Sequence, residues 1–554
     1  MASNKRKLSD VELEQLANMD ELQWNEFMDE FSDGGSLYEP SSCEHSSENS
    51  DADSSECNED DEQVGTTAAT TSNSDEWSDI PRDPPVFVFN ENVGLKLDLQ
   101  NFGINALVDF FFSDEFLTLL CEQTNLYARQ EAEKQGGRRS ARLSRWRDTD
   151  VAEMKVFLGL LLHMGPCCFP SIEHYWSTNP FYNVTFWRSI MSRNRFQLLL
   201  RYLHFSDNSL QSNDRLYKIR PVLDHFNNIM SNNYVPDKNL CIDESMVLWR
   251  GRLFFRQYIK NKKHKYGVKL YELCESNGVV LKIKIYCGKS EKNAEMGHAS
   301  DVVLHLMESL LNKGYVLHMD NFYNSVSLTK LLSTYKTYVC GTLRNNRKEN
   351  PKSLVAMKLK KGQMAWKRND NVVVCKWKDK RDVLTISNMH CAEMVEVRNR
   401  NGKVALKPNI VRDYNNGMAG VDQSDQMLSY YSALRKTVRW PKKLALHIIE
   451  IYLQNAHRFY NQTAGTSIKS LAFREKFIQA LIGDRMPDTQ KKSKTEGSFH
   501  YLEAIPPTEK KLRPTKPCRV CTQQKKRRES RYFCPVCEEK PALCVEECFK
   551  TYHQ

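Results

Sequence analysis

The sequence predicts an α/β fold that is flanked by helical segments and followed by a small cysteine-rich domain. Between residues 239 and 346 the apolar pattern follows the order strand, hairpin, helix, strand, helix. Apolar residues at helical spacing precede this stretch and return after about residue 418. Six of the 17 cysteines lie in the last 37 residues, which sets the C-terminal end apart. A chain of 554 residues is long enough for several such domains.

The first part of the globular chain is predicted to be helical. Residues 106–127 carry apolar side chains at helical spacing. A second apolar helix begins near Val151, where Asp150 and Glu153 stand at capping positions. Because helical patterning continues to about residue 230, we expect a helical domain over residues 84–238.

Strands dominate the next segment. Residues 240–243 form a short apolar run that ends in an acid. The runs 268–274 and 279–286 flank Ser276-Asn277-Gly278, and Asn-Gly between apolar runs is a strong hairpin signal. The remaining expected elements are a helix over 301–311, a strand over 315–319 and a helix over 325–335.

Residues 347–407 are expected to form a small β-rich insert. Short apolar runs at 372–377, 383–386 and 394–398 predict its strands, and Asn401-Gly402 predicts a turn. Helical patterning then runs to residue 460. The polar stretch 485–517 is expected to be a linker, and the cysteine cluster occupies 518–554.

Charge is divided unevenly along the chain. The net charge is +10, but residues 1–83 hold 23 acidic and 4 basic residues (−19), and the remainder holds 75 basic and 46 acidic residues (+29). The first segment buries too little apolar surface to fold and is expected to be a disordered arm. A basic body favours a polyanion such as nucleic acid, although an acidic solubility tail on an ordinary basic protein has the same balance. Neither a membrane-spanning run nor a secretory core is visible in the sequence, so we expect no membrane association and no secretion.

Four acids are candidates for metal chemistry. Asp243 and Asp320 each end a predicted strand, where open α/β sheets bind ligands. Carboxylates brought together repel one another unless a cation is present, and Mg²⁺ prefers such hard oxygen ligands. Asp422 and Asp425 lie three residues apart, on one face of a predicted helix near its N-terminus. The alternative is that these acids only cap neighbouring helices.

The motifs around these acids resemble those of piggyBac-type transposases. They occur in that family's order, and the resemblance covers about residues 90–480 and the C-terminal cysteines. The matching stretches are IDES at 242–245, WRGR at 249–252, KYG at 265–267, MDNFYNS at 319–325, DYN at 413–415, GVDQSDQM at 420–427 and RKTVRWP at 435–441.

The resemblance implies an RNase H-like catalytic core of the DDE/D class. Asp243, Asp320 and Asp422 would be its catalytic carboxylates and would bind two Mg²⁺ ions, with Asp425 as a supporting acid. Residues 239–346 and 408–431 would form the core, and 347–407 would interrupt it. The helical segments 84–238 and 432–484 would join into one dimerisation and DNA-binding domain.

Basic residues flank the acids and are candidates for phosphate contacts with DNA. The alternative is a solvated charged face. Trp440 either stacks on a base or fills the core. The candidate DNA-binding residues are Arg250, Arg252, Arg256, Lys262, Lys263, Lys265, Arg435, Lys436, Arg439, Trp440, Lys442 and Lys443.

The terminal cysteines have the spacing of zinc ligands. Two CxxC pairs each direct two thiolates at one ion, and a further Cys, Cys and His follow. The seven candidates exceed one tetrahedral site and fall one short of two, so His500, an acidic side chain or water remains open as an eighth ligand. The seven are Cys518, Cys521, Cys534, Cys537, Cys544, Cys548 and His553. Within this domain, KKRR at 525–528 predicts a phosphate contact or a nuclear import signal.

Together these observations predict a DNA transposase. The resemblance implies a nuclear, homodimeric enzyme that cuts double-stranded DNA at transposon ends, forms hairpins and joins the ends to TTAA targets. The main alternative is a domesticated DNA-binding or chromatin protein without transposition. A zinc-bearing interaction module with an unrelated core is a third hypothesis, which predicts that the acids can be changed freely.

Overall fold

The computed structural model describes residues 77–96, 102–134, 145–209, 212–259, 265–288, 297–398, 402, 404–434, 439–465, 467–486, 500–509 and 511–553. The chain forms two compact units, Met1–Arg485 and Met486–Gln554. Most of the predicted acidic arm lies outside the described residues. Among the helices that are described, none is both long and apolar enough to cross a membrane.

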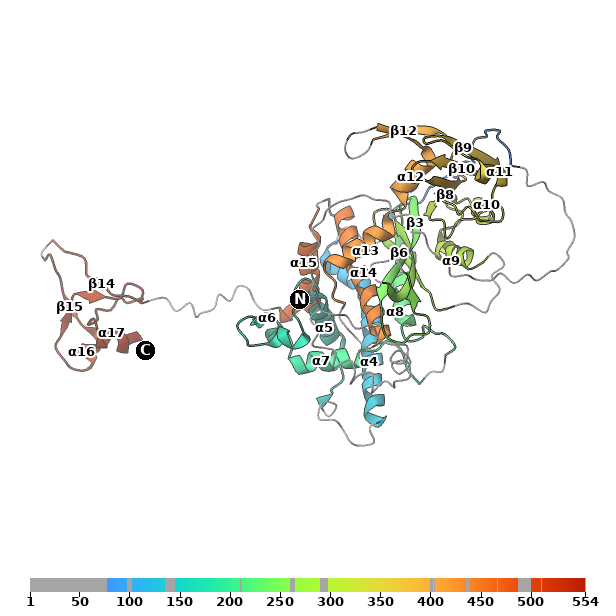
Figure 1. Cartoon of the computed structure of the whole chain (residues 1–554). Helices are drawn as coiled ribbons and strands as arrows, with labels where there is room; N and C mark the ends of the chain where they lie inside the picture. Colours follow the sequence, from blue (N-terminus) through green and yellow to red (C-terminus); the bar gives the residue numbers. More distant parts are fainter. Residues whose placement is uncertain are drawn as a thin grey trace, which may run out of the picture. The chain divides into compact units, whose positions relative to one another are not determined.

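A nine-stranded mixed sheet forms the centre of the first unit (Figure 1). Its order is β4-β5-β3-β7-β8-β11-β10-β9, and β6 also pairs with β5. Strand β3 is antiparallel to β5 and parallel to β7, and β7 is parallel to β8. The strands are β3 (Asn239–Leu248), β4 (Gln257–Tyr258), β5 (Tyr266–Glu275), β6 (Val280–Ile285), β7 (Val316–Met319), β8 (Tyr338–Thr342), β9 (Met364–Asn369), β10 (Val372–Lys378) and β11 (Asp382–Ser387).

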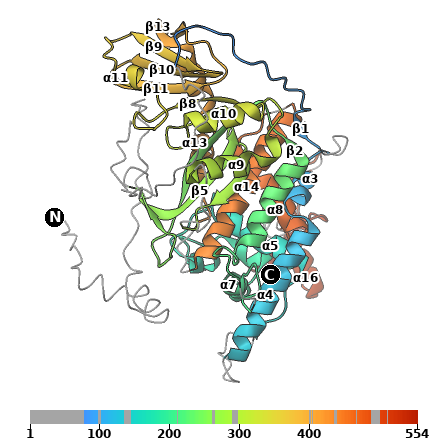
Figure 2. The ribbon, with the colours of Figure 1, turned by 90° about the vertical axis from the view of Figure 1, so that its right-hand side faces the viewer.

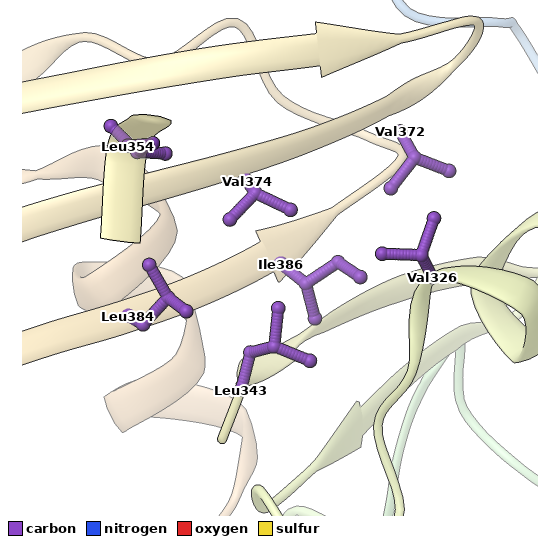
Figure 3. Packing of buried hydrophobic residues seen from close by; sticks show 7 residues of the cluster. All are labelled: Val326, Leu343, Leu354, Val372, Val374, Leu384 and Ile386. Atoms are coloured by element: carbon purple, nitrogen blue, oxygen red, sulfur yellow. The ribbon is translucent and has the colours of Figure 1, made fainter. Parts of the chain in front are cut away.

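The β-rich insert continues this sheet instead of forming a sheet of its own. Strand β11 pairs with β8, with Ile386 opposite Gly341. Apolar side chains of β10 and β11 pack together with Val326 and Leu343 in one buried cluster (Figure 3). Only the hairpin of β12 (Met394–Arg398) and β13 (Val404–Pro408) stands as a separate two-stranded sheet in this part of the chain.

Helices cover both faces of the sheet (Figures 1 and 2). Helices α13 (Gly420–Tyr430) and α14 (Trp440–Thr463) contact β3 on one side. On the other side, α9 (His298–Met307) contacts β5 and β6, and α10 (Val326–Thr334) contacts β8 and β10. Helix α12 (Asn409–Gly417) leads into α13 and contacts β3, β7 and β8.

Two asparagines cover the open edge of β6. Asn227 donates from Nδ2 to the Ile283 carbonyl at 3.0 Å and accepts from the Ile283 amide at 2.9 Å. Asn455 forms the same pair of bonds with Val280, at 2.7 and 3.1 Å. Because an amide side chain has the donor and acceptor of a peptide group, the edge strand is satisfied without another strand.

The predicted helices before and after the sheet pack on one another. Tyr452 of α14 stacks on Phe111 and Phe226, with ring centroids 5.2 and 5.7 Å apart. Helix α15 contacts α3 and α5. The helices of this layer include α3 (Ile104–Phe111), α4 (Asp114–Lys134), α5 (Val151–His163), α6 (Thr185–Ile190), α7 (Arg193–Tyr202), α8 (Arg220–Asn233) and α15 (Ser470–Ile482).

Local signals decide where these helices begin. The predicted cap of α5 is confirmed, since the Asp150 carboxylate accepts from the Glu153 amide at 2.8 Å. Glu153 itself is buried in an ion pair with Arg195. The apolar run 106–127 splits into α3 and α4, because the Ser113 hydroxyl accepts from the Phe116 amide at 3.3 Å and starts a new helix.

Two predicted boundaries shift. Residues 77–83 were assigned to the disordered arm, but Ser78 and Arg368 exchange backbone hydrogen bonds of 2.8 Å at the edge strand β9. The predicted linker reached residue 517, but Glu503 already pairs with Phe533 within the second unit. That unit holds short strand pairs, α16 (Arg519–Gln523) and α17 (Glu547–His553).

Candidate active site and metal centres

Asp243 and Asp320 lie at neighbouring positions of the sheet. Strands β3 and β7 are parallel, and their last paired residues are Ile242 and Met319, each directly before one of the acids. Both acids are half-buried. The Asp243 carboxylate accepts from the Glu244 amide at 2.8 Å, and the Asp320 carboxylate accepts from the Phe322 amide at 2.9 Å. The backbone therefore holds both acids at one part of the sheet.

Helix α13 brings Asp422 towards the same strand. A Cβ on Gly420 would lie 2.6 Å from Cys241 Sγ and 2.2 Å from the Glu275 carbonyl, so only glycine allows this close approach. Burial raises the pKa of the Cys241 thiol to about 12, and the charges of Asp243 and Asp422 act in the same direction. Cys241 therefore lies within electrostatic range of both acids. Asp422 is exposed and Asp425 is half-buried.

Asp320 is surrounded by opposing charges. Burial, and after it the nearby Glu244 carboxylate, raises the pKa of Asp320 to about 6, although the Phe322 amide, Arg344 and Lys269 act in the opposite direction. Lys269 Nζ lies 3.9 Å from Glu244 Oε2 and 4.7 Å from the centre of the Phe322 ring. Crowding of carboxylates in a buried place is the condition that a bound cation relieves.

The Asn324 side chain links the last residues of β7 and β8. Its Nδ2 donates to the carbonyls of Met319 and Thr342, both at 2.9 Å. A Cβ on Gly341 would come within 2.2 Å of Asn324 Nδ2 and of the Met319 carbonyl. The sequence analysis assigned no role to Asn324, Gly341, Glu244 or Lys269. Asn324 and Glu244 lie inside quoted motifs and Lys269 lies two residues after one, which was the available signal, whereas Gly341 lies in no motif.

The acids have the donor chemistry for Mg²⁺. All are carboxylates, the hard oxygen ligands that this ion takes. Among the described residues, two groups of His, Cys, Asp or Glu have ligand atoms that all lie within 4.8 Å of one another, and the four aspartates are in neither. Within the described part of the chain, the carboxylate oxygens of these aspartates therefore do not meet within 4.8 Å as a group of three.

The predicted DNA-binding residues fall into three groups. Lys262, Lys263, Arg435 and Lys436 lie outside the described residues. Arg250, Arg252, Arg256 and Lys265 are exposed on the segment between β3 and β5. The remaining residues contact the protein itself. Arg439, for example, donates from Nη1 to Tyr127 Oη of helix α4 at 2.5 Å.

Lys442 was predicted to contact DNA, and the structure contradicts this prediction. Its side chain is buried, and Nζ donates to the carbonyls of Leu200 and Arg201 at 2.6 and 2.7 Å. Those carbonyls belong to the last turn of α7, where the helix leaves acceptors without intrahelical partners. Lys442 therefore joins two helices. Lys443 is half-buried and remains a candidate.

Trp440 packs against the protein. Its ring meets that of Phe255 edge to face, with centroids 5.4 Å apart, and it is only half-buried. Phe255 itself is buried. Trp440 was predicted either to stack on a base or to fill the core, and its contact with Phe255 corresponds to the second role.

The second unit brings eight candidate metal ligands together in two sets of four. The first set is Cys518, Cys521, Cys544 and Cys548, and the second is His500, Cys534, Cys537 and His553. Within each set all ligand atoms lie within 4.8 Å of one another. Of the three alternatives for the eighth ligand, the structure brings His500 into position.

The spacing within each set fits zinc. Ligand atoms on a tetrahedral zinc ion lie roughly 3.3–3.8 Å apart, given Zn–S of about 2.3 Å and Zn–N of about 2.0–2.1 Å. Cys521 Sγ lies 3.5 Å from Cys548 Sγ and 3.9 Å from Cys544 Sγ. In the second set, His500 Nδ1 lies 3.5 Å from Cys534 Sγ and 3.4 Å from Cys537 Sγ.

A second contact orients His553. Its Nδ1–H donates to the Phe549 carbonyl at 2.8 Å, and Nε2 lies 3.1 Å from Cys537 Sγ. This hydrogen bond assigns the proton to Nδ1 and leaves the Nε2 lone pair for a metal, as in many zinc sites. The two sets alternate along the chain, so each ion would tie together distant parts of this small unit.

Comparison with known proteins agrees with the two units. A family model described as "Transposase IS4" matches residues 107–457, more than half of the chain. A second model, described as a DDE_Tnp_1-like zinc finger, matches residues 501–554. The latter range supports a zinc-binding C-terminal domain.

Three human proteins that are similar to this chain are all named piggyBac transposable element-derived proteins. PiggyBac transposable element-derived protein 2 is 25% identical over 436 residues, which cover 73% of this chain and 70% of the relative. PiggyBac transposable element-derived protein 3 is 26% identical over 389 residues, covering 67% of this chain and 63% of the relative. PiggyBac transposable element-derived protein 5 is 24% identical over 434 residues, covering 74% and 81%.

A solved structure has a similar fold. It is a cryo-EM structure of the piggyBac transposase synaptic complex with hairpin DNA, with a TM-score of 0.63 and 24% sequence identity. The match covers 83% of this chain and all of the other. With the family model and the human relatives, these findings identify the chain as a member of the piggyBac-type transposase family.

Proposed function

We propose that this protein is a metal-dependent DNA transposase that cuts and rejoins DNA through Asp243, Asp320 and Asp422. The observation that carries the proposal is that two acids follow the last paired residues of adjacent parallel strands, in a chain of a transposase family. The order of β5, β3, β7 and β8, with one antiparallel and two parallel pairings, supports an RNase H-like core.

In this proposal the three carboxylates hold Mg²⁺, with Asp425 as a supporting acid. Two bound Mg²⁺ ions would supply an activated attacking oxygen and a stabilised leaving oxygen. Lys269 and Arg344, the cations that oppose the raised pKa of Asp320, would hold phosphates beside the reacting one. The acids alone repel DNA, so both the metal and these cations are needed.

The substrate would be double-stranded DNA at transposon ends. Hairpin formation and joining to TTAA targets belong to the proposal, supported by the fold shared with a piggyBac transposase in complex with hairpin DNA. Action as a homodimer in the nucleus is part of the same proposal. The exposed cations at 525–528 are a candidate import signal.

An excision assay on the matched transposon tests the proposal. Asp320→Asn keeps the size of the side chain but removes the charge that binds metal, so excision should fall by a factor of roughly 10³ or more while DNA binding remains. Asp109→Asn is a matched control, since its side chain is 72% exposed on α3. If the Asp320→Asn variant excised the transposon as fast as the Asp109→Asn variant, the assignment of Asp320 as a catalytic residue would be refuted.

A second candidate function is DNA binding without transposition. It is favoured by the names of the human relatives, which call them transposable element-derived proteins. None of the three acids is substituted in this chain, which favours the enzyme. Sequence-specific binding by a chain that never excises flanking DNA, with all acids intact, would support the second function.

A further inference from the structure

We propose that the segment between β3 and β5 binds unpaired DNA bases by stacking them on exposed aromatic rings. The platform is defined here as Phe254, Tyr258 and Tyr266 with the cations Arg215 and Arg256. The Tyr266 carbonyl accepts from the amide of Trp249, which lies just beyond the end of β3 and six residues after Asp243, a distance of about 20 Å at the rise of a β-strand. The proposal rests on the proposed function, because it names the form of DNA held beside that site.

The platform exposes large rings to solvent. Phe254 is 79% exposed, Tyr258 is 54% exposed and Tyr266 is 44% exposed. Tyr258 and Tyr266 are opposite partners of β4 and β5, with ring centroids 4.7 Å apart. Side chains directly opposite one another in an antiparallel pair share one face of the sheet. The two rings therefore lie side by side on one face of the sheet, and both are exposed to solvent.

An arginine lies over two of the three rings. The Arg215 guanidinium lies 4.3 Å from the centre of the Phe254 ring, and that of Arg256 lies 5.4 Å from the centre of Tyr266. Arg256 Nη1 also donates to the Arg250 carbonyl at 2.8 Å. A guanidinium held this close to a ring keeps its positive charge beside a base that stacks on that ring.

The Phe254 end is held by three separate segments. Arg215 comes from the turn before α8 and donates from Nη1 to the Cys287 carbonyl at 2.9 Å. Gly288 has φ +103°, and a Cβ there would meet Arg215 Nη1 at 2.5 Å and Phe254 Cε1 at 3.2 Å. The arginine and the ring are therefore positioned by contacts that are independent of any ligand.

The charge of the segment identifies the class of partner. Residues 249–265 contain seven Lys or Arg residues and no acid. Apolar protein partners do not need this excess of cations, whereas a phosphate chain does. Bases inside a duplex hide their faces in the stack, so exposed rings favour unpaired nucleotides. Such nucleotides arise wherever strands are separated during cutting and rejoining.

Binding measurements on the full chain test this proposal. The protein carries Asp320→Asn so that DNA is not cut, and the probes are a labelled oligodeoxythymidine and a blunt duplex of equal length. Phe254→Ala, and Tyr258→Ala with Tyr266→Ala, should each lower the affinity for the single strand roughly tenfold or more, and change the duplex affinity less than about twofold. Phe181→Ala removes a ring that is 89% exposed elsewhere and should change neither.

Other results would overturn the proposal. Unchanged single-strand affinity in the platform variants would mean that the rings do not stack on bases. An equal loss for duplex and single strand would indicate phosphate contact only. A change in oligomeric state without a change in DNA affinity would identify a protein contact. If the unaltered chain, with Asp320 intact, does not excise the transposon although single-strand binding depends on the platform, the proposed function is refuted and this binding site remains.

Discussion

His500 Nδ1 lies 3.4 Å from Cys537 Sγ, although 37 positions separate the two residues in the sequence. The contact completes the second set of four metal ligands in the C-terminal unit. It also moves the start of that unit well before the first CxxC pair. The ligand arrangement leads to the first of four predictions.

The purified chain should contain two zinc ions. Cys521→Ser removes a ligand of the first set, so metal analysis should find about one ion, and the C-terminal unit should lose stability because zinc binding is coupled to folding. His500→Ala should weaken the second site and release that ion first to a chelator. Cys168→Ser, an exposed cysteine outside both sets, is the control and should retain two ions. One ion in the unaltered chain would contradict the two-site arrangement.

Gly341→Ala should disturb the site without touching an acid. The added Cβ would lie 2.2 Å from the Met319 carbonyl, so β7 and β8 must separate next to Asp320. We expect a loss of about 1–3 kcal/mol in the free energy of unfolding and a larger loss of excision. Gly103→Ala is the control, because nothing lies within 4 Å of its Cβ and φ is −163°. Equal stability of the two variants in urea unfolding would refute the close packing.

Stability should fall as pH rises through neutrality because of Glu450. This buried carboxyl group accepts from the Ala433 amide, and burial raises its pKa from 4.5 to about 7. A raised folded-state pKa contributes stability that is complete below pH 4.5 and lost as pH rises through 7. As pH rises from 4.5 to above 7, the free energy of unfolding of Glu450→Gln should therefore increase relative to that of the parent by on the order of 3 kcal/mol. Glu475→Gln, exposed on α15, should leave the profile unchanged. Parallel pH profiles for Glu450→Gln and the parent would contradict the prediction.

Lys442 should matter for folding and not for DNA. Lys442→Met keeps the apolar stem but leaves the Leu200 and Arg201 carbonyls without their donor, which should cost about 2 kcal/mol of unfolding free energy. DNA affinity at fixed salt should stay the same. Lys313→Met is the control, since its side chain is 39% exposed and it should change stability by less than about 0.5 kcal/mol. Weaker DNA binding at unchanged stability would restore the original prediction.

The sequence predicts the elements of the sheet well, because strand and hairpin signals are local. The Asn277-Gly278 turn joins β5 and β6 as expected, and Gly278 has φ +91°. The predicted strand before Asp320 is β7. The β-rich insert was assigned its strands correctly, but pairing of β11 with β8 depends on residues that lie more than 40 positions apart. No local pattern encodes such a pairing.

In the candidate site too, the sequence predicted the residues but not their surroundings. The three acids were selected from strand-end positions and from quoted motifs, and they remain predictions. Their electrostatic surroundings could not be read from the sequence, because Glu244 and Lys269 act on Asp320 through space. For Lys442 the sequence led to a wrong prediction. Its position beside a basic motif indicated a DNA contact, but its hydrogen-bond partners are carbonyls on another helix.

By itself, the sequence determined the family, the strand-end acids, the division into an acidic segment and a basic remainder, and seven of the eight candidate zinc ligands, because composition and spacing are properties of neighbouring residues. Only the tertiary structure decided which cysteines lie together as one candidate ligand set, that His500 completes the other set, that the insert continues the central sheet, and that Lys442 is buried. These features depend on contacts between residues far apart in the chain, and packing and burial select among them once the chain has folded.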